Sequence, residues 1–236
     1  MTGEHPSPRR HAGPLRGLLV TGTDTGVGKT AVTAALAHKC AQHGMLVAAL
    51  KPIVSGVEAD GTWEDVEILR AASQPPRSVA ETGLYAFDPP VAPHWAAHQA
   101  GVTVERGRVA AFVRMQSVAM DCVLVEGAGG FLTPLGDDWG VAELAGDLHF
   151  PVLLVVGLRL GAINHTLLSV EAIRVRGLRL AGWVANTLNP AVAVGTLETL
   201  QGRLAAPCLG VLPYTPYWSP AILSPCLSLP DVLYWC

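Results

Sequence analysis

The sequence contains few charged residues and very few lysines. Asp, Glu, Lys and Arg make up 15% of 236 residues, the formal net charge is −3, and lysine occurs only at positions 29, 39 and 51. Nucleic acids and anionic membrane surfaces attract proteins with dense clusters of Lys and Arg, which this chain lacks. We therefore expect no nucleic-acid partner and no membrane partner, and we expect a small molecule instead.

The sequence also lacks a long apolar run and any cysteine pair of the C-x-x-C type. The densest apolar stretch, residues 150–158, is too short to span a bilayer and ends at Arg159. Five cysteines are an odd number in a long chain, so reduced thiols are expected and a disulfide framework is not. Residues 1–16 lack the apolar core of a signal peptide and are predicted to form a disordered leader of a cytoplasmic protein.

Short apolar runs alternate with longer helical patterns along the rest of the chain. The runs lack a period of two, as is typical of strands buried on both faces of a parallel sheet. Strands are predicted at residues 18–20, 46–50, 122–125, 151–156, 181–185 and 208–212, and helices at 29–43, 65–73, 104–120, 162–176 and 192–204. The alternation predicts a doubly wound α/β fold, with a mostly parallel sheet flanked by helices, in a single domain over residues 17–236.

Polar residues or glycines follow each predicted strand. Two proline-rich segments, residues 75–93 and 213–230, are predicted to be loops over this scaffold. Ligands of open α/β sheets bind beyond the carboxyl ends of the strands, so the residues after the six strands are expected to line one cleft. These residues are Thr21, Gly22, Lys51, Glu126, Gly157, Asn186, Pro213 and Tyr214.

The stretch TGTDTGVGKT, residues 21–30, lies between the first predicted strand and the first predicted helix. Its glycines allow backbone N–H groups to turn inward around phosphates, and the N-terminus of the following helix adds a partial positive charge. In such a loop Lys29 contacts the β- and γ-phosphates, and the Thr30 hydroxyl binds Mg²⁺. The strict pattern G-x-x-x-x-G-K-[ST] fails here, because Thr23 stands at the first glycine position. A plain strand-to-helix turn is the alternative.

Three further residues have a functional interpretation and a simpler alternative. Glu126 follows a predicted strand, where it would bind the magnesium ion of a nucleotide or would be a solvated charge or the partner of a helix N-terminus. Asp65 begins a predicted helix and is either a second metal ligand or an N-cap. Lys51 ends a buried strand, where its ammonium is either solvated or directed at an anion in the cleft.

Five segments, in order along the chain, closely resemble dethiobiotin synthetase. They are TGTDTGVGKT (21–30), KPIVSG (51–56), VEGAGGFLTP (125–134), VGLRLGAINH (156–165) and AGWVAN (181–186). The resemblance extends from about residue 18 to residue 214, which is most of the chain. In that family the loop has the form G-T-D-T-x-V-G-K-T, so Thr23 is expected. The resemblance implies a P-loop NTPase fold.

The resemblance implies an ATP- and magnesium-dependent ligase of biotin biosynthesis. The family converts 7,8-diaminononanoate, CO₂ and ATP into dethiobiotin, ADP and phosphate. One amine forms a carbamate with CO₂, the γ-phosphate passes to the carbamate, and the second amine displaces phosphate to close the ureido ring. Phosphoryl transfer depends mainly on positioning and charge stabilisation, which two lysines and a metal ion supply. The family is a homodimer.

The resemblance also implies roles for individual residues. Lys29 and Lys51 would be catalytic, and Thr30, Asp65 and Glu126 would bind Mg²⁺. Nucleotide contacts would come from Gly26, Val27, Gly28, Lys29, Thr30, Ala31, Asp65, Glu126, Gly127, Ala128, Gly129, Asn186, Thr187, Pro213 and Tyr214. Substrate contacts would come from Thr25 and Ser55 and, for the carboxylate of a substrate in the other subunit, from Gly161, Ala162, Ile163 and Asn164.

Two of these roles have structural alternatives, and the sequence departs from the family in places. Asn186 would read adenine through its amide, or it would only form a turn. The helix start at Gly161 would bind a carboxylate, or it would only be a capped helix. Gly26 stands where relatives can carry Glu, and Arg159 stands where a relative can carry Lys. The proline-rich tail after Tyr214 is poorly suited to the helical end expected in the family.

Two other classes of nucleotide-binding protein remain as alternatives. A switch ATPase of the partition or septum-placement type shares the fold, but it has an extra lysine early in the loop, where this chain has Asp24 and Thr25. Such proteins also often carry a basic amphipathic tail. A cobyrinate-type ligase carries an amidotransferase domain, for which the residues after Tyr214 are too few.

Overall fold

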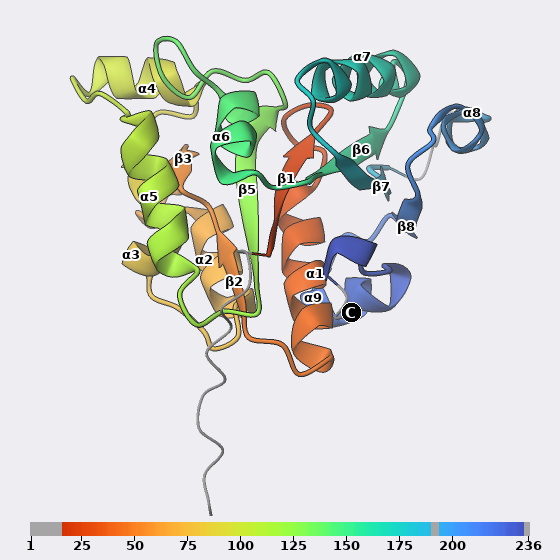
Figure 1. Cartoon of the computed structure of the whole chain (residues 1–236), viewed down its shortest axis with the longest axis horizontal. Coiled ribbons are helices and arrows are strands. Elements are labelled where there is room, and N and C mark those ends of the chain that lie inside the picture. Colours follow the sequence, from red (N-terminus) through yellow and green to blue (C-terminus); the bar gives the residue numbers. More distant parts are fainter. Residues whose placement is uncertain (1–15, 190–193, 234–236) are drawn as a thin grey trace, which may run out of the picture.

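A parallel sheet of six strands forms the centre of the computed structural model, which describes residues 16–189 and 194–233. The strands are β1 (Gly17–Gly22), β2 (Val47–Leu50), β5 (Cys122–Gly130), β6 (Val152–Leu158), β7 (Leu180–Thr187) and β8 (Cys208–Leu212). They lie in the order β2-β5-β1-β6-β7-β8, and every neighbouring pair is parallel. The predicted doubly wound α/β fold is confirmed, and the carboxyl ends of the strands point toward the top of Figure 1.

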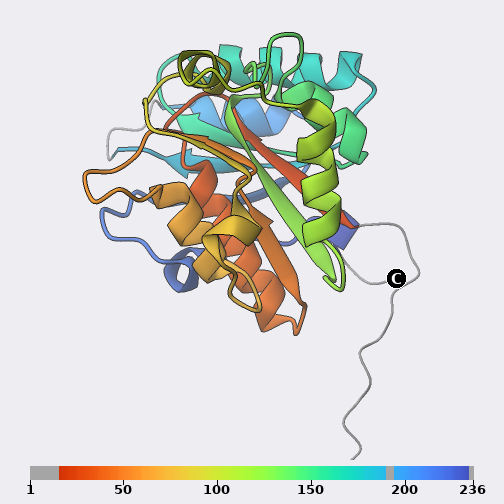
Figure 2. The same ribbon diagram turned by 90° about the vertical axis from the view of Figure 1, so that its left-hand side faces the viewer.

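Helices cover both faces of this sheet, as Figure 2 shows. The longer helices are α1 (Lys29–Gln42), α2 (Glu64–Ala72), α5 (Arg106–Gln116), α6 (Val141–Leu148), α7 (Ala162–Val175) and α8 (Thr196–Arg203). Successive residues of a strand point to opposite faces. In β1, Leu18 and Val20 therefore pack in the core with α1, whereas Leu19 packs in the core with α5 and α6.

The prolines in residues 75–93 predicted a loop, but this prediction is wrong. These residues contain the short helix α3 (Val79–Thr82) and β4 (Tyr85–Phe87), which pairs in parallel with β3 (Ile53–Ser55) in a second sheet of two strands. Tyr85 and Phe87 are buried and Ala86 is exposed. An alternation of three residues is too short to be recognised in a sequence. Helices α4 (Pro93–Gln99) and α6 were not predicted either.

The tail after β8 is also more ordered than the prediction of a loop allowed. It forms the one-turn helix α9 (Pro220–Leu223) and the 3₁₀ turns η1 (Ser224–Cys226) and η2 (Asp231–Leu233). Leu223, Leu227, Leu229 and Leu233 are buried in the core that contains α1. Proline at the first position of a helix is compatible with helical geometry, because its missing N–H has no partner within the helix there. The tail therefore packs against the core around α1.

Four strands, β1, β5, β6 and β7, are longer than predicted. Glu126 and Asn186 were expected just after their strands, but they lie inside β5 and β7, paired in register with Val20 and Gly157. In each strand the apolar run ends before the strand itself does. Backbone hydrogen bonds to the neighbouring strand do not depend on side-chain type, so they continue through the polar residues. Both side chains nevertheless stay at the carboxyl edge of the sheet.

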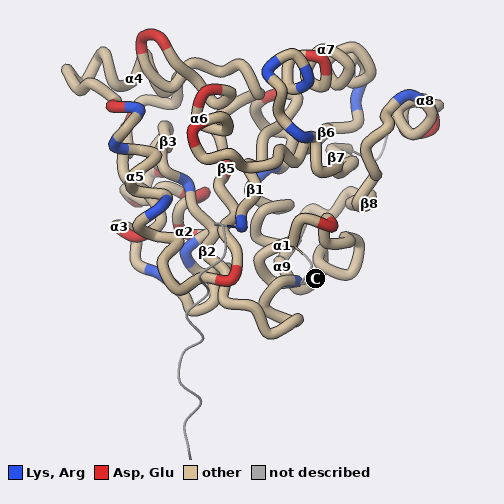
Figure 3. The backbone as a smooth tube through the Cα atoms, in the orientation of Figure 1, with Lys and Arg blue, Asp and Glu red and all other residues tan. Residues whose placement is uncertain are grey.

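Charged residues of both signs are interspersed along the described chain, as Figure 3 shows. Within residues 16–189 and 194–233, no helix is both long and apolar enough to cross a membrane. The four cysteines in these ranges, Cys40, Cys122, Cys208 and Cys226, are free thiols, as expected. Nearly all of the predicted leader, the first two residues of the helix predicted at 192–204, and Cys236 lie outside the described residues.

The packing between β6, β7 and the helices α7 and α8 gives a test of the fold. Trp183 of β7 is fully buried there, and its ring nitrogen donates to the Ala206 carbonyl at 3.2 Å. We predict that Trp183→Ala lowers the free energy of unfolding by about 3–5 kcal/mol. Trp95→Ala is the control, because that side chain is 50% exposed. Urea denaturation measures both, and equal losses in the two variants would contradict the packing described.

Candidate active site

The loop between β1 and α1 depends on two glycines with positive φ. Gly26 has a φ of 71° and Gly28 a φ of 88°, values that residues with a side chain rarely adopt. Gly22 has a different role, since a Cβ atom at this position would lie 2.5 Å from Val27 Cγ2. Thr23 donates its backbone N–H to the Val155 carbonyl at 2.9 Å and is not in a left-handed conformation. A glycine at position 23 is therefore not required.

Helix α1 begins directly after this loop, at Lys29. The free N–H groups of its first turn point toward the loop, which is the usual arrangement at an anion site. The Lys29 side chain is buried, and its Nζ donates to the Asp24 carbonyl at 3.0 Å. Burial, and then the charge of Lys51, lower the pKa of Lys29 to about 8. A nearby anion such as a phosphate would favour the charged form of this lysine.

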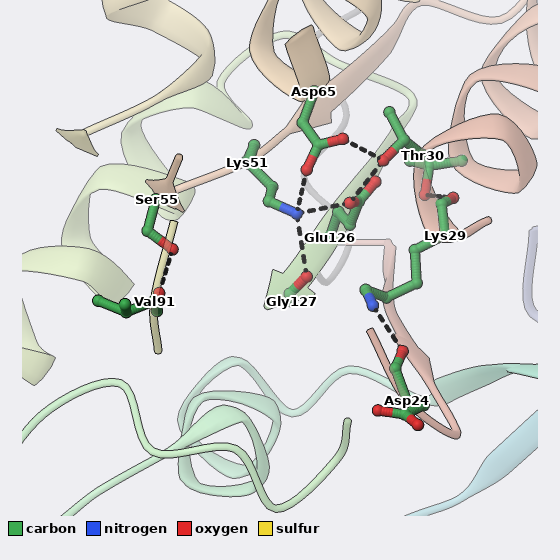
Figure 4. A network of polar contacts seen from close by, with 10 residues as sticks. Asp24, Lys29, Thr30, Lys51, Ser55, Asp65, Val91, Glu126 and Gly127 are labelled. Carbon is green, nitrogen blue, oxygen red and sulfur yellow. Dashed lines mark hydrogen bonds and ion pairs between the residues drawn. The ribbon is translucent and has the colours of Figure 1, made fainter. Parts of the chain in front are cut away.

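Lys51, at the end of β2, lies between two carboxylates (Figure 4). Its Nζ is 2.6 Å from Glu126 Oε1 and 2.8 Å from Asp65 Oδ2, and it donates to the Gly127 carbonyl at 3.3 Å. Its side chain is 5% exposed and that of Glu126 is fully buried. Burial alone would lower the pKa of Lys51, but the charges of Glu126 and Asp65 raise it above its usual value. The lysine is therefore a fixed positive charge.

The two carboxylates differ in how easily they ionise. Burial raises the pKa of Glu126, although the charge of Lys51 opposes this effect. Burial is also the largest single influence on Asp65 and opposes its ionisation, but the charge and hydrogen bond of Lys51, the hydrogen bond from Thr30 and the charge of Lys29 together lower its pKa. Thr30 Oγ1 lies 2.5 Å from Asp65 Oδ1 and 3.0 Å from Glu126 Oε1, as drawn in Figure 4. A hydroxyl carries one hydrogen, so it cannot donate fully to both carboxylates at once.

Thr30, Asp65 and Glu126 offer the oxygen ligands that Mg²⁺ prefers. Mg²⁺ binds through oxygen, commonly with one or two carboxylates, and phosphate oxygens of a nucleotide supply further ligands. Glu126 Oε2 is buried and has no hydrogen-bond partner, so one carboxylate oxygen is free to bind a cation. Among the described residues no group of three or more His, Cys, Asp or Glu is placed to hold a metal. The Thr30 hydroxyl and the two carboxylates fit magnesium bound together with phosphates.

Several simpler interpretations of these residues are wrong. Glu126 is 1% exposed and is not a solvated charge. Asp65 is the second residue of α2, whose N-cap is Trp63, so Asp65 is not an N-cap. Asn186 lies inside β7 and is not in a turn. Its Nδ2 donates to the Val27 carbonyl at 2.9 Å, and this contact ties β7 to the phosphate loop.

The remaining predicted nucleotide contacts lie on the same edge of the sheet. Ala31 is in the first turn of α1 beside Lys29 and Thr30. Gly127, Ala128 and Gly129 continue β5 beyond Glu126, and Thr187 ends β7 after Asn186. Pro213 and Tyr214 follow β8 and are exposed. No hydrogen bond of these last two side chains contributes to the cluster around Lys51.

The six predicted substrate residues, which lie in three places, are apart from the cluster around Lys51. Ser55 ends β3 and donates its hydroxyl to the Val91 carbonyl at 2.7 Å, to the side of Lys51 in Figure 4. Thr25 is exposed on the phosphate loop, and its backbone N–H donates to Asp24 Oδ1 at 2.8 Å. Gly161, with a φ of 90°, is the N-cap of α7, and no side chain caps that helix. Of the next three residues, Ala162 is buried, Ile163 is half-buried and Asn164 is exposed.

Sequence reasoning assigned no role to two charged residues of this edge. Arg159, between β6 and α7, forms an ion pair with Asp24 of the phosphate loop. The backbone hydrogen bond from Thr25 is the main reason that the pKa of Asp24 is lowered, and Arg159 contributes further. The sequence held one signal for this ion pair, namely opposite charges that follow β1 and β6. Adjacent parallel strands bring the residues after their carboxyl ends together.

Comparison with known proteins gives two kinds of similarity by sequence. A family model described as "AAA domain" matches residues 16–221. The ATP-dependent dethiobiotin synthetase BioD of Aromatoleum aromaticum is 44% identical over 220 residues, covering 91% of this chain and 98% of the relative. The protein of the same name from Nitrosospira multiformis is 48% identical over 202 residues, covering 84% of this chain and 88% of the relative.

Solved structures with a similar fold are more distant in sequence. The septum site-determining protein MinD from Pyrococcus horikoshii, complexed with Mg-ADP, has a TM-score of 0.55 and 15% identity, with 86% of this chain and 82% of that chain covered. A ParA family ATPase from Chlorobium tepidum has a TM-score of 0.52 and 13% identity, with 86% and 85% covered. At such identities these likenesses support only the phosphate-loop fold. Fold, site and sequence relatives together assign this chain to the dethiobiotin synthetase family.

Proposed function

We propose that the cluster of Thr30, Lys51, Asp65 and Glu126 is where this chain carries out ATP-dependent formation of dethiobiotin. The family assignment supplies the activity: the chain is a ligase of biotin biosynthesis that uses ATP and diaminononanoate. The observation that carries the placement is the buried Lys51 ammonium, held between two carboxylates beside the phosphate loop. CO₂ is the proposed third substrate, because a ureido ring needs one more carbon than the diamine provides.

The loop around Gly26 and Gly28 and the first turn of α1 are proposed to hold the phosphates of ATP. Lys29 supports this role, because among the described residues its Nζ donates to the Asp24 carbonyl, a neutral acceptor that a phosphate oxygen can replace. Asn186 is proposed to read adenine with the part of its amide not bonded to Val27. Pro213, Tyr214 and Thr187 would flank the nucleoside, and the glycines after Glu126 would allow a close approach of the ligand.

Mg²⁺ is proposed to bind at Thr30, Asp65 and Glu126. Bound there together with ATP, the metal would neutralise charge on the phosphates during transfer. The unpaired Glu126 Oε2 and the position of the Thr30 hydroxyl next to both carboxylates support these ligands. Lys51 offsets part of the negative charge of the two carboxylates, which favours the ionised form of Glu126 in its fully buried position.

The two lysines are proposed to stabilise the transferred phosphoryl group from two sides. The carbamate formed from one substrate amine would attack the γ-phosphate, and the second amine would then displace phosphate and close the ring. The chain contributes positive charge that is already in place, because Lys51 is locked by three contacts and does not reorganise. Thr25 and Ser55 are proposed to contact the amines or the carbamate.

A homodimer is proposed to complete the substrate site. The N-terminus of α7, from Gly161 to Asn164, would bind the carboxylate of the substrate held by the other subunit. The exposed apolar side chains next to and along α7 support an interface there: Leu160 is 93% exposed, Leu168 57% and Val175 73%. We also propose that residues 17–236 are one domain. A cytoplasmic location remains a prediction from the sequence.

The defining experiment tests the activity of the purified protein. With diaminononanoate, bicarbonate and MgATP, phosphate release should depend on the diamine, and dethiobiotin should accumulate in equal amount. The switch ATPase alternative instead requires phosphate release in the absence of diamine. Mass spectrometry of the product and a phosphate assay separate the two, and diamine-independent hydrolysis without dethiobiotin would refute the proposed reaction.

The three lysines of the chain allow a controlled test of Lys51. We predict that Lys51→Ala lowers kcat by at least about 100-fold, the loss typical of removing one group that stabilises the transition state, while nucleotide still binds. Lys29→Ala should weaken both turnover and nucleotide binding. Lys39→Ala is the control, because Lys39 is in the last turn of α1, away from the phosphate loop, where its Nζ donates to the Ser224 carbonyl. Full turnover of Lys51→Ala would exclude this lysine from the mechanism.

The metal site is tested with variants on one helix, α2. We predict that Asp65→Asn raises the Mg²⁺ concentration needed for half-maximal turnover by about 10-fold or more, because a ligand charge is lost. Glu67→Gln is the matched control, since Glu67 pairs with Arg70 on the surface of the same helix. Titration of turnover with MgCl₂ at saturating ATP measures the effect. Identical metal dependence in the two variants would remove Asp65 from the metal site.

A further inference from the structure

The connection between β6 and α7 has one side chain that holds it to the phosphate loop. It consists of Arg159, Leu160 and Gly161, of which Leu160 and Gly161 are exposed. The Arg159 guanidinium forms an ion pair with Asp24 Oδ2. Among the described residues, this is the side-chain hydrogen bond that joins the loop between β1 and α1 to the start of α7, and His165 in the first turn of α7 adds an electrostatic interaction with Asp24.

Asp24 connects three parts of the site. Its Oδ2 binds Arg159, its Oδ1 accepts the Thr25 N–H at 2.8 Å, and its carbonyl accepts Lys29 Nζ at 3.0 Å. The carboxylate is fixed by the backbone of the next residue, so it is a positioned partner and not a freely rotating charge. Arg159 therefore binds to a rigid point on the phosphate loop.

We propose that Arg159 is a positioning residue that fixes the N-terminus of α7 relative to the phosphate loop. Gly161 lies two residues after Arg159. Because Asp24 holds the Arg159 side chain, the short connection from Arg159 to Gly161 cannot move far from the phosphate loop. The proposed carboxylate site at Gly161–Asn164, which serves the substrate held by the other subunit, is thereby held in place by a contact within its own chain. This inference rests on the proposed function, since it assumes that the start of α7 binds the substrate carboxylate.

Arg159 acts in this proposal through Asp24 and does not touch the reacting atoms. Its side chain is 42% exposed and that of Asp24 is 45% exposed, so the pair is half-solvated. Such pairs have small effects that salt weakens. A catalytic arginine at the γ-phosphate would instead affect turnover and ATP use strongly. The size and the target of the effect therefore distinguish the two roles.

The test measures the KM of each substrate separately. We expect Arg159→Gln to raise the KM for diaminononanoate by about three- to five-fold, the range for losing a half-exposed ion pair. The KM for ATP and kcat should stay unchanged, because only ground-state placement of one substrate is affected. Arg159→Lys should restore most of the loss, and high salt should reduce the difference from wild type. Arg174→Gln, in the last turn of α7, is the control with the same change in charge.

A double-mutant cycle with Asp24 decides whether the pair is responsible. Asp24→Asn keeps an oxygen for the Thr25 N–H, and it replaces the charged oxygen that binds Arg159 by a neutral NH₂ group that cannot accept a hydrogen bond. If the proposal is right, Arg159→Gln with Asp24→Asn is no worse than Arg159→Gln alone. Additive losses, a higher KM for ATP alone, or an unchanged KM for the diamine would each overturn it. Wild-type protein that makes no dethiobiotin would refute the proposed function instead.

Discussion

A buried ammonium between two carboxylates determines how this site is built. Lys51 cannot be moved out of the sheet edge without leaving Glu126 as an unpaired charge in the interior, which is costly. The three side chains come from β2, α2 and β5, so one interaction fixes the relative placement of three elements. Thr30 joins this group from α1, and the phosphate loop is thereby held at a defined distance from the carboxylates. The contacts of Lys51 with Glu126, Asp65 and Gly127 thus both hold the site together and place a buried positive charge in it.

Much of the fold could be read from the sequence because its strands are continuous apolar runs. A strand buried on both faces gives an unbroken apolar run, and all six strands of the main sheet were located, although several of them extend further than the apolar run. The elements that were missed are short or partly polar. β3 and β4 have three residues each, and α6 follows a glycine-rich stretch without a clear start signal. Their stability comes from tertiary packing, which no local pattern records.

The residue types of the site could be named from the sequence, but their mutual contacts could not. Lysine at the end of β2 and glutamate in β5 lie 75 residues apart, and only the strand order β2-β5-β1 makes them neighbours. The loop shows the limit of pattern matching more clearly. Gly26 and Gly28 are required by positive φ, whereas the glycine that the strict motif demands at position 23 is not required. The ion pair between Asp24 and Arg159 was not predicted, because it depends on β1 and β6 being neighbours in the sheet, and the residue spacing does not record the strand order.

The packing of the tail also affects how the protein can be engineered. β1 starts at the edge of the sheet opposite the site, so sequence added before Gly17 enters the fold far from the phosphate loop. The carboxyl end is different, because Leu223, Leu227, Leu229 and Leu233 share the core with α1, the helix that presents Lys29 and Thr30. Shortening the chain there would remove support from behind the nucleotide loop. Affinity tags and fusion partners therefore belong at the amino end.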